Sequence, residues 1–238
     1  PPGNYDASSL PLRIYRNTRL TLCDGAVIRR AGAGTMLLNG DASQTFGGYT
    51  GHGNIVIEGG TWDARADAYP TSAMAISIGH AENVIIRNTL VKDVCGYHGI
   101  EMNATKRGRI TDVTCLGYKD PDGTRDFSEA IQFDLAKGSS YFGGFGPYDD
   151  TPCVDIVVKD CHVGPSGTAG TTSWPRAVGS LCLRCRTGRR GSPSRRCRRR
   201  GCRRTARTRR STSCPWRGRT GSPRRSRGCR RGPCSPGT

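Results

Sequence analysis

Short apolar segments recur along the first 180 residues with one shared pattern of apolar and polar positions. Four of them align: Ile55-Val-Ile-Glu-Gly-Gly, Val84-Ile-Ile-Arg-Asn-Thr, Gly108-Arg-Ile-Thr-Asp-Val and Ile156-Val-Val-Lys-Asp-Cys. Their starts lie 29, 24 and 48 residues apart, and the last spacing is twice the second. Self-similarity at a fixed period is the mark of a repeat protein.

A second set of segments repeats with nearly the same spacing. Its members are Ala75-Ile-Ser-Ile-Gly, Gly99-Ile-Glu-Met-Asn and Ala130-Ile-Gln-Phe-Asp. Alternation along a strand predicts two inward columns: Ile76, Ile100 and Ile131, then Ile78, Met102 and Phe133. The residues between the columns face outward: Ser77, Glu101 and Gln132.

A period of about 24 residues with two or three short strands per turn predicts an all-β fold, a right-handed parallel β-helix. Leucine-rich repeats need a Leu-x-x-Leu-x-Leu motif that is absent, and a propeller blade needs about 40 residues. A β-sandwich would not keep one residue type in register. The many β-branched residues and glycines disfavour a helical solenoid.

We expect about six coils. The first opens at Arg16–Leu22 with Met36–Asn39 as its partner strand, and the last recognisable rung is Pro175–Ser180. Neither end shows an obvious cap, although solenoid ends need one, so we expect an incomplete helix. The chain starts without Met or an apolar leader, so we expect any signal peptide to be removed or never included.

The net charge of +18 divides very unevenly. Residues 1–180 hold 16 basic and 19 acidic residues, a net charge of −3, whereas residues 181–238 hold 21 Arg and no Lys, Asp or Glu. We therefore predict two regions, a β-helix domain over 1–180 and a disordered basic tail over 181–238, and no specific nucleic-acid partner. No apolar run approaches the roughly 18 residues of a membrane span.

The tail contains only nine residue types, those favoured by GC-rich codons. This bias indicates GC-rich DNA translated out of frame. A genuine Arg-rich arm and a Cys-rich module remain alternatives, but among its seven cysteines only Cys182 and Cys185 form a Cys-x-x-Cys pair. That single pair is a weak zinc signal.

Several motifs in residues 1–180 resemble the pectin-lyase-like β-helix superfamily, which includes pectate lyases and polygalacturonases. Pro1-Pro-Gly-Asn-Tyr and Leu20-Thr-Leu-Cys-Asp-Gly-Ala-Val-Ile are similar to its opening coil. His98-Gly-Ile-Glu-Met resembles the Asp-Gly-Ile-Asp stretch of polygalacturonases, and Ser128-Glu-Ala-Ile-Gln-Phe their Asp-Asp-Cys-Ile-Ala-Ile stretch. His98 and Ser128 stand where that family has aspartates. The resemblance implies a secreted protein acting on an acidic polysaccharide.

Coil stacking predicts one polar patch built from residues distant in sequence. His98 and Glu129 occupy corresponding positions on neighbouring coils, about 4.8 Å apart. The patch also pairs Glu101 with Gln132, and Asn103 with Asp134. Polysaccharide hydrolysis needs one carboxyl as acid and another to activate water or attack. The alternative is that these polar side chains are only solvated or form stacked ladders.

We assign Glu129 as the acid, Glu101 or Asp134 as the partner carboxylate, and His98 as a tuning or proton-relay group. Hydrolysis is favoured slightly over calcium-dependent lyase cleavage, and a non-catalytic carbohydrate-binding or adhesion helix is the rival. The hydrolase needs no cofactor, and we expect a monomer. Asn103 and Gln132 are candidate substrate-binding residues.

Two insertions adjoin the patch, Gly117–Phe127 and Gly138–Pro152. The second is Gly-rich and carries four aromatic residues that suit stacking on sugar rings: Tyr141, Phe142, Phe145 and Tyr148. The alternative is that these rings pack against the side of the helix.

Carboxylates and cations near the insertions suggest weaker assignments. Asp149 and Asp150, with Asp155, are candidate calcium ligands for a lyase. Lys106 and Lys137 are candidate substrate-binding cations, with Arg107 and Arg109 nearby. Cys153 and Cys161 are a candidate disulfide, although their spacing alone does not show one.

Overall fold

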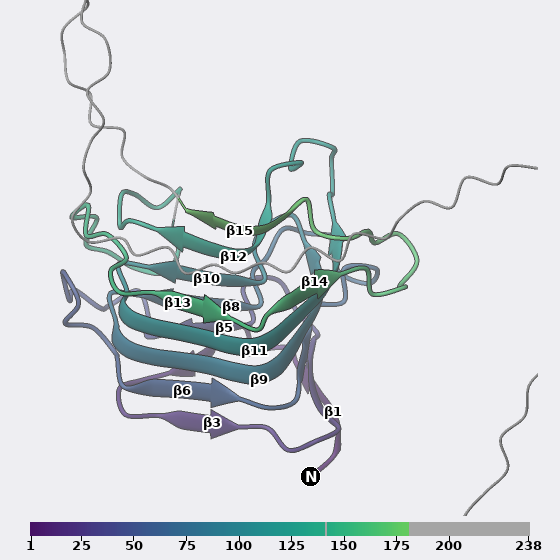
Figure 1. Cartoon of the computed structure of the whole chain (residues 1–238), viewed down its shortest axis with the longest axis horizontal. Helices are drawn as coiled ribbons and strands as arrows, with labels where there is room; N and C mark the ends of the chain where they lie inside the picture. Colours follow the sequence, from purple (N-terminus) through teal and green to yellow (C-terminus); the bar gives the residue numbers. More distant parts are fainter. Residues whose placement is uncertain (141, 181–238) are drawn as a thin grey trace, which may run out of the picture. The chain divides into compact units, whose positions relative to one another are not determined.

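The computed structural model describes residues 1–140 and 142–180, and it contains strands but no helix within them. Six strands form one parallel sheet: β2 (Leu12–Ile14), β5 (Leu37–Asn39), β8 (Ile76–Gly79), β10 (Ile100–Asn103), β12 (Glu129–Asp134) and β15 (Arg176–Ser180). Each strand belongs to a different coil, so the six-stranded sheet contains one strand from each of six coils (Figure 1).

The opposite side of the coils is a second parallel sheet of nine strands. Its members are β1 (Gly3–Ala7), β3 (Arg19–Thr21), β4 (Ala26–Arg30), β6 (Ile55–Glu58), β7 (Thr61–Asp63), β9 (Glu82–Cys95), β11 (Lys106–Lys119), β13 (Val157–Lys159) and β14 (His162–Gly164). The predicted fold class, a right-handed parallel β-helix of about six coils, is confirmed.

The register between coils follows the sequence repeats. Val84 pairs with both Ile55 and Gly108. On the other sheet, Ile100 pairs with Ile76 and with Ile131. Because side chains alternate along a strand, this register stacks like residues from coil to coil and creates continuous apolar columns.

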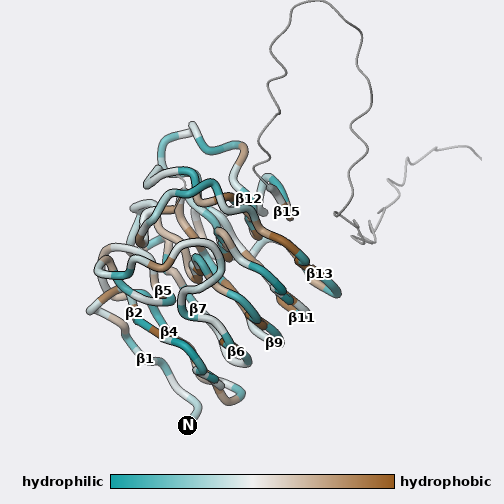
Figure 2. Tube along the Cα trace, turned by 90° about the vertical axis from the view of Figure 1, so that its left-hand side faces the viewer, coloured by the Kyte–Doolittle hydropathy of each residue, from teal (hydrophilic) through white to brown (hydrophobic). Residues whose placement is uncertain are grey.

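Those columns form the core. The three isoleucines of the first inward column are at most 1% exposed, as are Ile78 and Met102 in the second. Figure 2 shows the coils one behind another, with apolar residues recurring among polar ones along the trace. At about 25 cal/mol per Å² of buried apolar surface, this stacking is the main source of stability.

Two strands are longer than the repeats predict, because β9 and β11 each span 14 residues. Each contains three residues with positive φ, and the ladder between the two strands is interrupted at all three places; the middle ones are Asn88 (49°) and Asp112 (53°). Asn and Asp tolerate this left-handed backbone better than other residues with side chains. Each long strand therefore bends and serves two sides of the coil.

An asparagine ladder fixes one corner of the coils. Asn17, Asn54 and Asn83 all have positive φ. Asn54 Nδ2 donates to Asn17 Oδ1 at 3.0 Å, and Asn83 Nδ2 donates to Asn54 Oδ1 at 2.9 Å. Arg107 Nε then donates to Asn83 Oδ1 at 2.6 Å. The turns between coils are thus held by side chains as well as by backbone bonds.

All described residues belong to one compact unit. The predicted tail, residues 181–238, lies outside the described residues. Within residues 1–140 and 142–180, no helix is long and apolar enough to cross a membrane. The candidate disulfide is wrong, because Cys153 and Cys161 are both free thiols.

Candidate functional site

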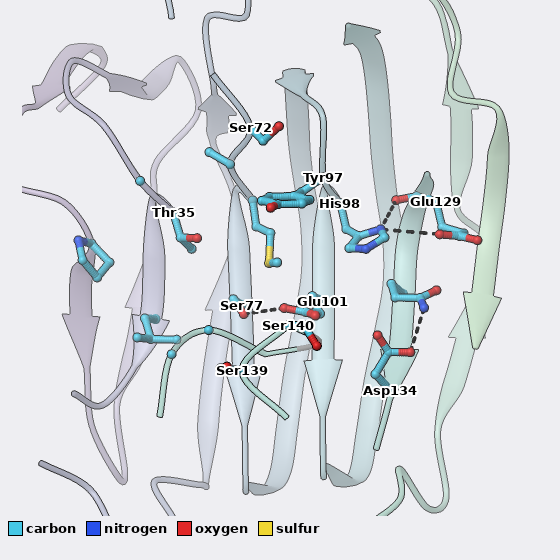
Figure 3. Close-up of a pocket in the computed structure, with 18 of the residues that line it drawn as sticks. Thr35, Ser72, Ser77, Tyr97, His98, Glu101, Glu129, Asp134, Ser139 and Ser140 are labelled. Carbon is cyan, nitrogen blue, oxygen red and sulfur yellow. Dashed lines mark hydrogen bonds and ion pairs between the residues drawn. The ribbon is translucent and has the colours of Figure 1, made fainter. Parts of the chain in front are cut away.

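A cavity of about 650 Å³ opens on the outer face of the six-stranded sheet. Its floor is formed by side chains of β8, β10 and β12, and two loops flank it, residues 120–128 and residues 138–144. Figure 3 shows Ser77, Glu101 and Glu129 facing this space from neighbouring strands, with His98 beside them from the turn before β10. The predicted polar patch is therefore recessed rather than exposed.

The outward column of the repeat forms the centre of the cavity floor. Glu101 pairs in register with Ser77 on one side and Gln132 on the other. These side chains point away from the core as predicted, yet the three residues are only 3%, 1% and 9% exposed for Ser77, Glu101 and Gln132. Burial of these side chains changes the pKa of Glu101, the one ionisable residue among the three.

Glu101 is the most strongly perturbed carboxyl of the cavity. Its Oε2 accepts a hydrogen bond from Ser77 Oγ at 2.9 Å, whereas its Oε1 is buried without a hydrogen-bond partner among the described residues. The pKa of Glu101 is raised to about 8, mainly by burial and also by the nearby charge of Asp134, while the Ser77 hydroxyl and Asn103 amide act in the opposite direction. A carboxyl with this pKa holds a proton at neutral pH.

Glu129 lies between His98 and Arg176, which come from the coil before and the coil after that of Glu129. Its Oε1 is 3.3 Å from Arg176 Nη1, and its Oε2 is 3.6 Å from His98 Nδ1. Burial raises the pKa of Glu129, and the hydrogen bond and charge of Arg176 oppose that rise. The predicted contact between His98 and Glu129 is confirmed (Figure 3).

Gln132 and Asp134 lie near the two carboxyls, since Gln132 pairs in register with Glu101 and the Asp134 charge acts on both glutamates. Gln132 Nε2 donates to Asp134 Oδ1 at 2.7 Å, and Gln132 Oε1 is buried without a partner among the described residues. Asn103 pairs in register with Asp134, as predicted, and is completely buried. Buried polar atoms rarely lack hydrogen bonds, so the unpaired Gln132 Oε1 and Glu101 Oε1 set this cluster apart from a purely structural one.

Gly179 leaves room for the side chains of Glu129 and Gln132 because it has no side chain of its own. A Cβ on Gly179 of β15 would lie 2.5 Å from both Gln132 Oε1 and Glu129 Cγ. The side chains of Glu129 and Gln132 therefore converge over Gly179, and any larger residue there would push them aside.

The 120–128 loop supplies a cation that the motifs did not reveal. The Arg125 guanidinium carbon lies 4.2 Å from the Tyr97 ring centroid and 5.6 Å from that of Phe127. All three residues line the cavity, as does Arg13 of β2. The long insertion was the available signal, although β11 extends to Lys119 and the loop begins only after it.

The two predicted substrate-binding lysines do not line the cavity. Lys106 belongs to the nine-stranded sheet, where its Nζ lies 3.0 Å from Glu82 Oε1 and 5.8 Å from the Tyr49 ring centroid. Lys137 is exposed just after β12. The cations that line the cavity are Arg13 and Arg125 instead.

The aromatic residues of the Gly138–Pro152 loop are mostly buried. Phe142 and Phe145 are 1% and 4% exposed and form a small apolar cluster with Leu38, their ring centroids 4.9 Å apart. They pack against the side of the helix, so their predicted stacking on sugars is wrong. Tyr148 is 42% exposed but does not line the cavity, and Tyr141 lies outside the described residues.

The candidate calcium ligands make other contacts. Asp149 Oδ2 accepts a hydrogen bond from the Gly48 amide at 2.8 Å, and its Oδ1 accepts one from the Thr151 amide. Asp150 has positive φ, and Asp155 pairs with Arg109 at 3.2 Å. The described residues contain no group of three or more His, Cys, Asp or Glu residues suited to a metal.

Comparisons with known proteins support the fold. No protein-family model and no curated protein matches the chain. Two solved structures of PfbA, a surface adhesin of Streptococcus pneumoniae, match with a TM-score of 0.65 and 19% identity over 77% of this chain. The chain spans 45% and 48% of the length of those two chains.

A third structure, of a proposed glycosyl hydrolase from Parabacteroides merdae, matches 75% of this chain and 81% of its own length. Its TM-score is 0.40 and its identity 12%. That likeness is too weak to support an argument. At 19% identity the PfbA match shows the β-helix fold alone, so function has to be inferred from the site.

Proposed function

We propose that the protein is a glycoside hydrolase that cleaves an acidic polysaccharide in the cavity of the six-stranded sheet. The observation that carries this proposal is the pair of carboxyls with unlike surroundings. Glu101 is buried with its pKa raised to about 8, whereas Glu129 lies against the Arg176 guanidinium. Glycoside hydrolysis uses such a pair, one carboxylic acid and one carboxylate.

In this mechanism Glu101 donates its proton to the glycosidic oxygen as the bond breaks. Glu129, where the Arg176 guanidinium opposes the rise that burial gives the pKa, is the carboxylate that activates the attacking water or attacks the anomeric carbon itself. These roles exchange the sequence-based ones, which made Glu129 the acid. The exchange follows from burial, since Glu101 is 1% exposed and no described cation pairs with it. Asp134 supports the protonated state of Glu101 through its charge.

The acidic nature of the substrate rests on the two arginines of the cavity. Arg13 and Arg125 both line it. Arg125 makes no ion pair within the described residues, and its guanidinium is held on the Tyr97 ring. A planar guanidinium presents several N–H donors to a carboxylate. Acid–base catalysis by two carboxyls needs no metal or organic cofactor, and we propose none.

A second candidate function is carbohydrate binding without cleavage. The likeness to PfbA, described as a surface adhesin, favours it, because both chains share the β-helix fold. A surface or secreted location follows from either function, since polysaccharides of this class are extracellular substrates or ligands. We therefore propose an extracellular protein, and we keep the monomer expected from the sequence as part of the proposal.

The deciding experiment measures new reducing ends released from polygalacturonate and other acidic polysaccharides. We expect release by the wild-type chain, loss of at least about 100-fold in Glu101→Gln, and unchanged release by Glu82→Gln. Glu82 is a matched control because it lies on the nine-stranded sheet beside Lys106.

Ultraviolet absorbance of the products separates hydrolysis from lyase cleavage, because only a lyase forms an unsaturated uronate. Absorbing products that require calcium would overturn the hydrolase in favour of a lyase. Glycan binding without turnover in wild type, unchanged in Glu101→Gln, would favour the non-catalytic function.

A further inference from the structure

The His98 side chain is only 13% exposed beside Glu129, and its ring hydrogen bond fixes where its proton lies. The ring Nδ1 is 3.2 Å from the Glu129 backbone oxygen and 3.6 Å from Glu129 Oε2. A carbonyl oxygen can only accept a hydrogen bond, so Nδ1 has to carry the hydrogen. The second nitrogen of a neutral imidazole then has a free lone pair.

The surroundings of His98 keep the ring neutral. The pKa of His98 is lowered to about 4, mainly by burial and also by the Arg125 charge, whereas the bond to the Glu129 oxygen acts in the opposite direction. The charged groups that act on the ring are thus Glu129 of β12 and Arg125 of the 120–128 loop. At neutral pH His98 is a neutral ring with an acceptor at Nε2.

The Nε2 atom is reachable from the cavity. His98 lines the cavity, and no described residue donates a hydrogen bond to Nε2. Nε2 is also absent from the buried polar atoms that lack a partner, unlike Nε2 of His80. Figure 3 shows the His98 ring between Tyr97 and Glu129 on the side of the cavity where Glu129 lies.

We propose that His98 is a specificity-determining residue that accepts, at Nε2, a hydrogen bond from a hydroxyl group of the bound glycan. The glycan as ligand rests on the proposed function, but the position of the proton on the ring does not. An acceptor repels a carboxylate, so the uronate carboxylate binds elsewhere in the cavity, at Arg125 or Arg13. Neither motif resemblance nor charge counting indicates that a histidine binds the hydroxyl group while an arginine binds the carboxylate.

Two other histidines serve as internal references. His52 Nδ1 accepts a hydrogen bond from the Arg16 amide at 3.2 Å, so His52 carries its hydrogen on Nε2. His80 Nδ1 lies 2.9 Å from the Gly48 oxygen, so His80 has the same tautomer as His98, but its Nε2 is buried. We therefore expect the three rings to differ, in one sample, in tautomer or in the access of a ligand to Nε2.

The first test is a two-bond proton–nitrogen NMR spectrum of the ¹⁵N-labelled full chain. We expect His98 to be the Nδ1–H tautomer and His52 the Nε2–H tautomer, with no protonation of His98 between about pH 5.5 and pH 8. A His98 ring protonated at Nε2, or one that titrates near its ordinary pKa of about 6.5, would overturn the proposal.

The second test adds a galacturonate oligosaccharide to the Glu101→Gln chain, which cannot cleave it. We expect the Nε2 resonance of His98 to shift toward a hydrogen-bonded value while that of His80 stays constant. If amides of β10 and β12 shift and His98 Nε2 does not, the acceptor role is wrong although a glycan binds. If nothing shifts, the glycan-binding function fails, and the acceptor role falls with it.

A matched pair of variants gives the affinity. In the Glu101→Gln background we expect His98→Phe to weaken oligosaccharide binding about tenfold by calorimetry, equivalent to one hydrogen bond of about 1.4 kcal/mol. His52→Phe, outside the cavity, should bind as before. Equal affinity of the His98→Phe and parent chains would contradict the proposal.

Discussion

Glu101 shows how burial turns an ordinary carboxyl into a proton donor. Its pKa of about 8 means that it is protonated at neutral pH and loses its proton as the pH rises through that value. We therefore expect the rate of reducing-end release to fall above about pH 8, with a midpoint set by Glu101. A pH–rate profile checks this, and a rate that stays constant up to pH 10 would contradict the assignment.

The same burial makes Glu101 costly to the folded state at high pH. A carboxyl whose pKa is higher folded than unfolded supports the fold below its ordinary pKa and loses that support as pH rises toward the folded value. The glutamine of Glu101→Gln cannot ionise, so we expect this variant to have a higher melting temperature than wild type at pH 9. The difference corresponds to roughly a few kcal/mol of unfolding free energy. At pH 4 the two melting temperatures should converge. An equal difference at both pH values would show that ionisation is not the cause.

At the scale of single elements, the corner asparagines hold the turn between successive coils. Asn83 has φ of 60° and both accepts from Arg107 and donates to Asn54. Asn83→Ala should lower the free energy of unfolding by about 1–2 kcal/mol, because alanine tolerates this left-handed backbone less well than asparagine and the side-chain bonds are lost. Asn83→Gly is the matched control, which loses the bonds without the strain. Denaturant unfolding should rank Ala below Gly, and the reverse order would be contrary to this account.

The Gly138–Pro152 loop is a separate element attached by Phe142 and Phe145. Phe142 packs directly over Gly79, and Gly144 packs over Leu38. We expect Phe142→Ala to raise amide exchange of residues 143–152 at least tenfold while the strands of the six-stranded sheet stay protected, because the loop can open locally. Tyr148→Ala, at an exposed ring, should leave exchange nearly unchanged. Hydrogen exchange by mass spectrometry distinguishes this local opening from global unfolding.

At the scale of the whole molecule, the coil register was predictable because it repeats. Ile76, Ile100 and Ile131 recur at the same place in each coil, and that recurrence sets which outward residues meet. The proximity of His98 and Glu129 follows directly from it. One alternating pattern, repeated several times, carries more information than any single motif in this chain.

Features that do not repeat could not be predicted in the same way. The path of a Gly-rich loop depends on where its aromatic rings pack in the folded protein, which the sequence pattern does not show. The burial of Phe142 was therefore not predicted. Lys106 is close to the site in sequence, yet it belongs to the other sheet. The protonation of Glu101 depends on loops from other coils that cover it, which a linear pattern does not encode.

The central claim is that stacked coils and flanking loops create a carboxyl that holds its proton at neutral pH. A carbon-13 NMR titration of the Glu101 side chain, assigned with Glu101→Gln, tests it without any assumption about the substrate. The account predicts a single transition at about pH 8. A transition near the ordinary value of about 4.3 would contradict it and leave the cavity without its acid.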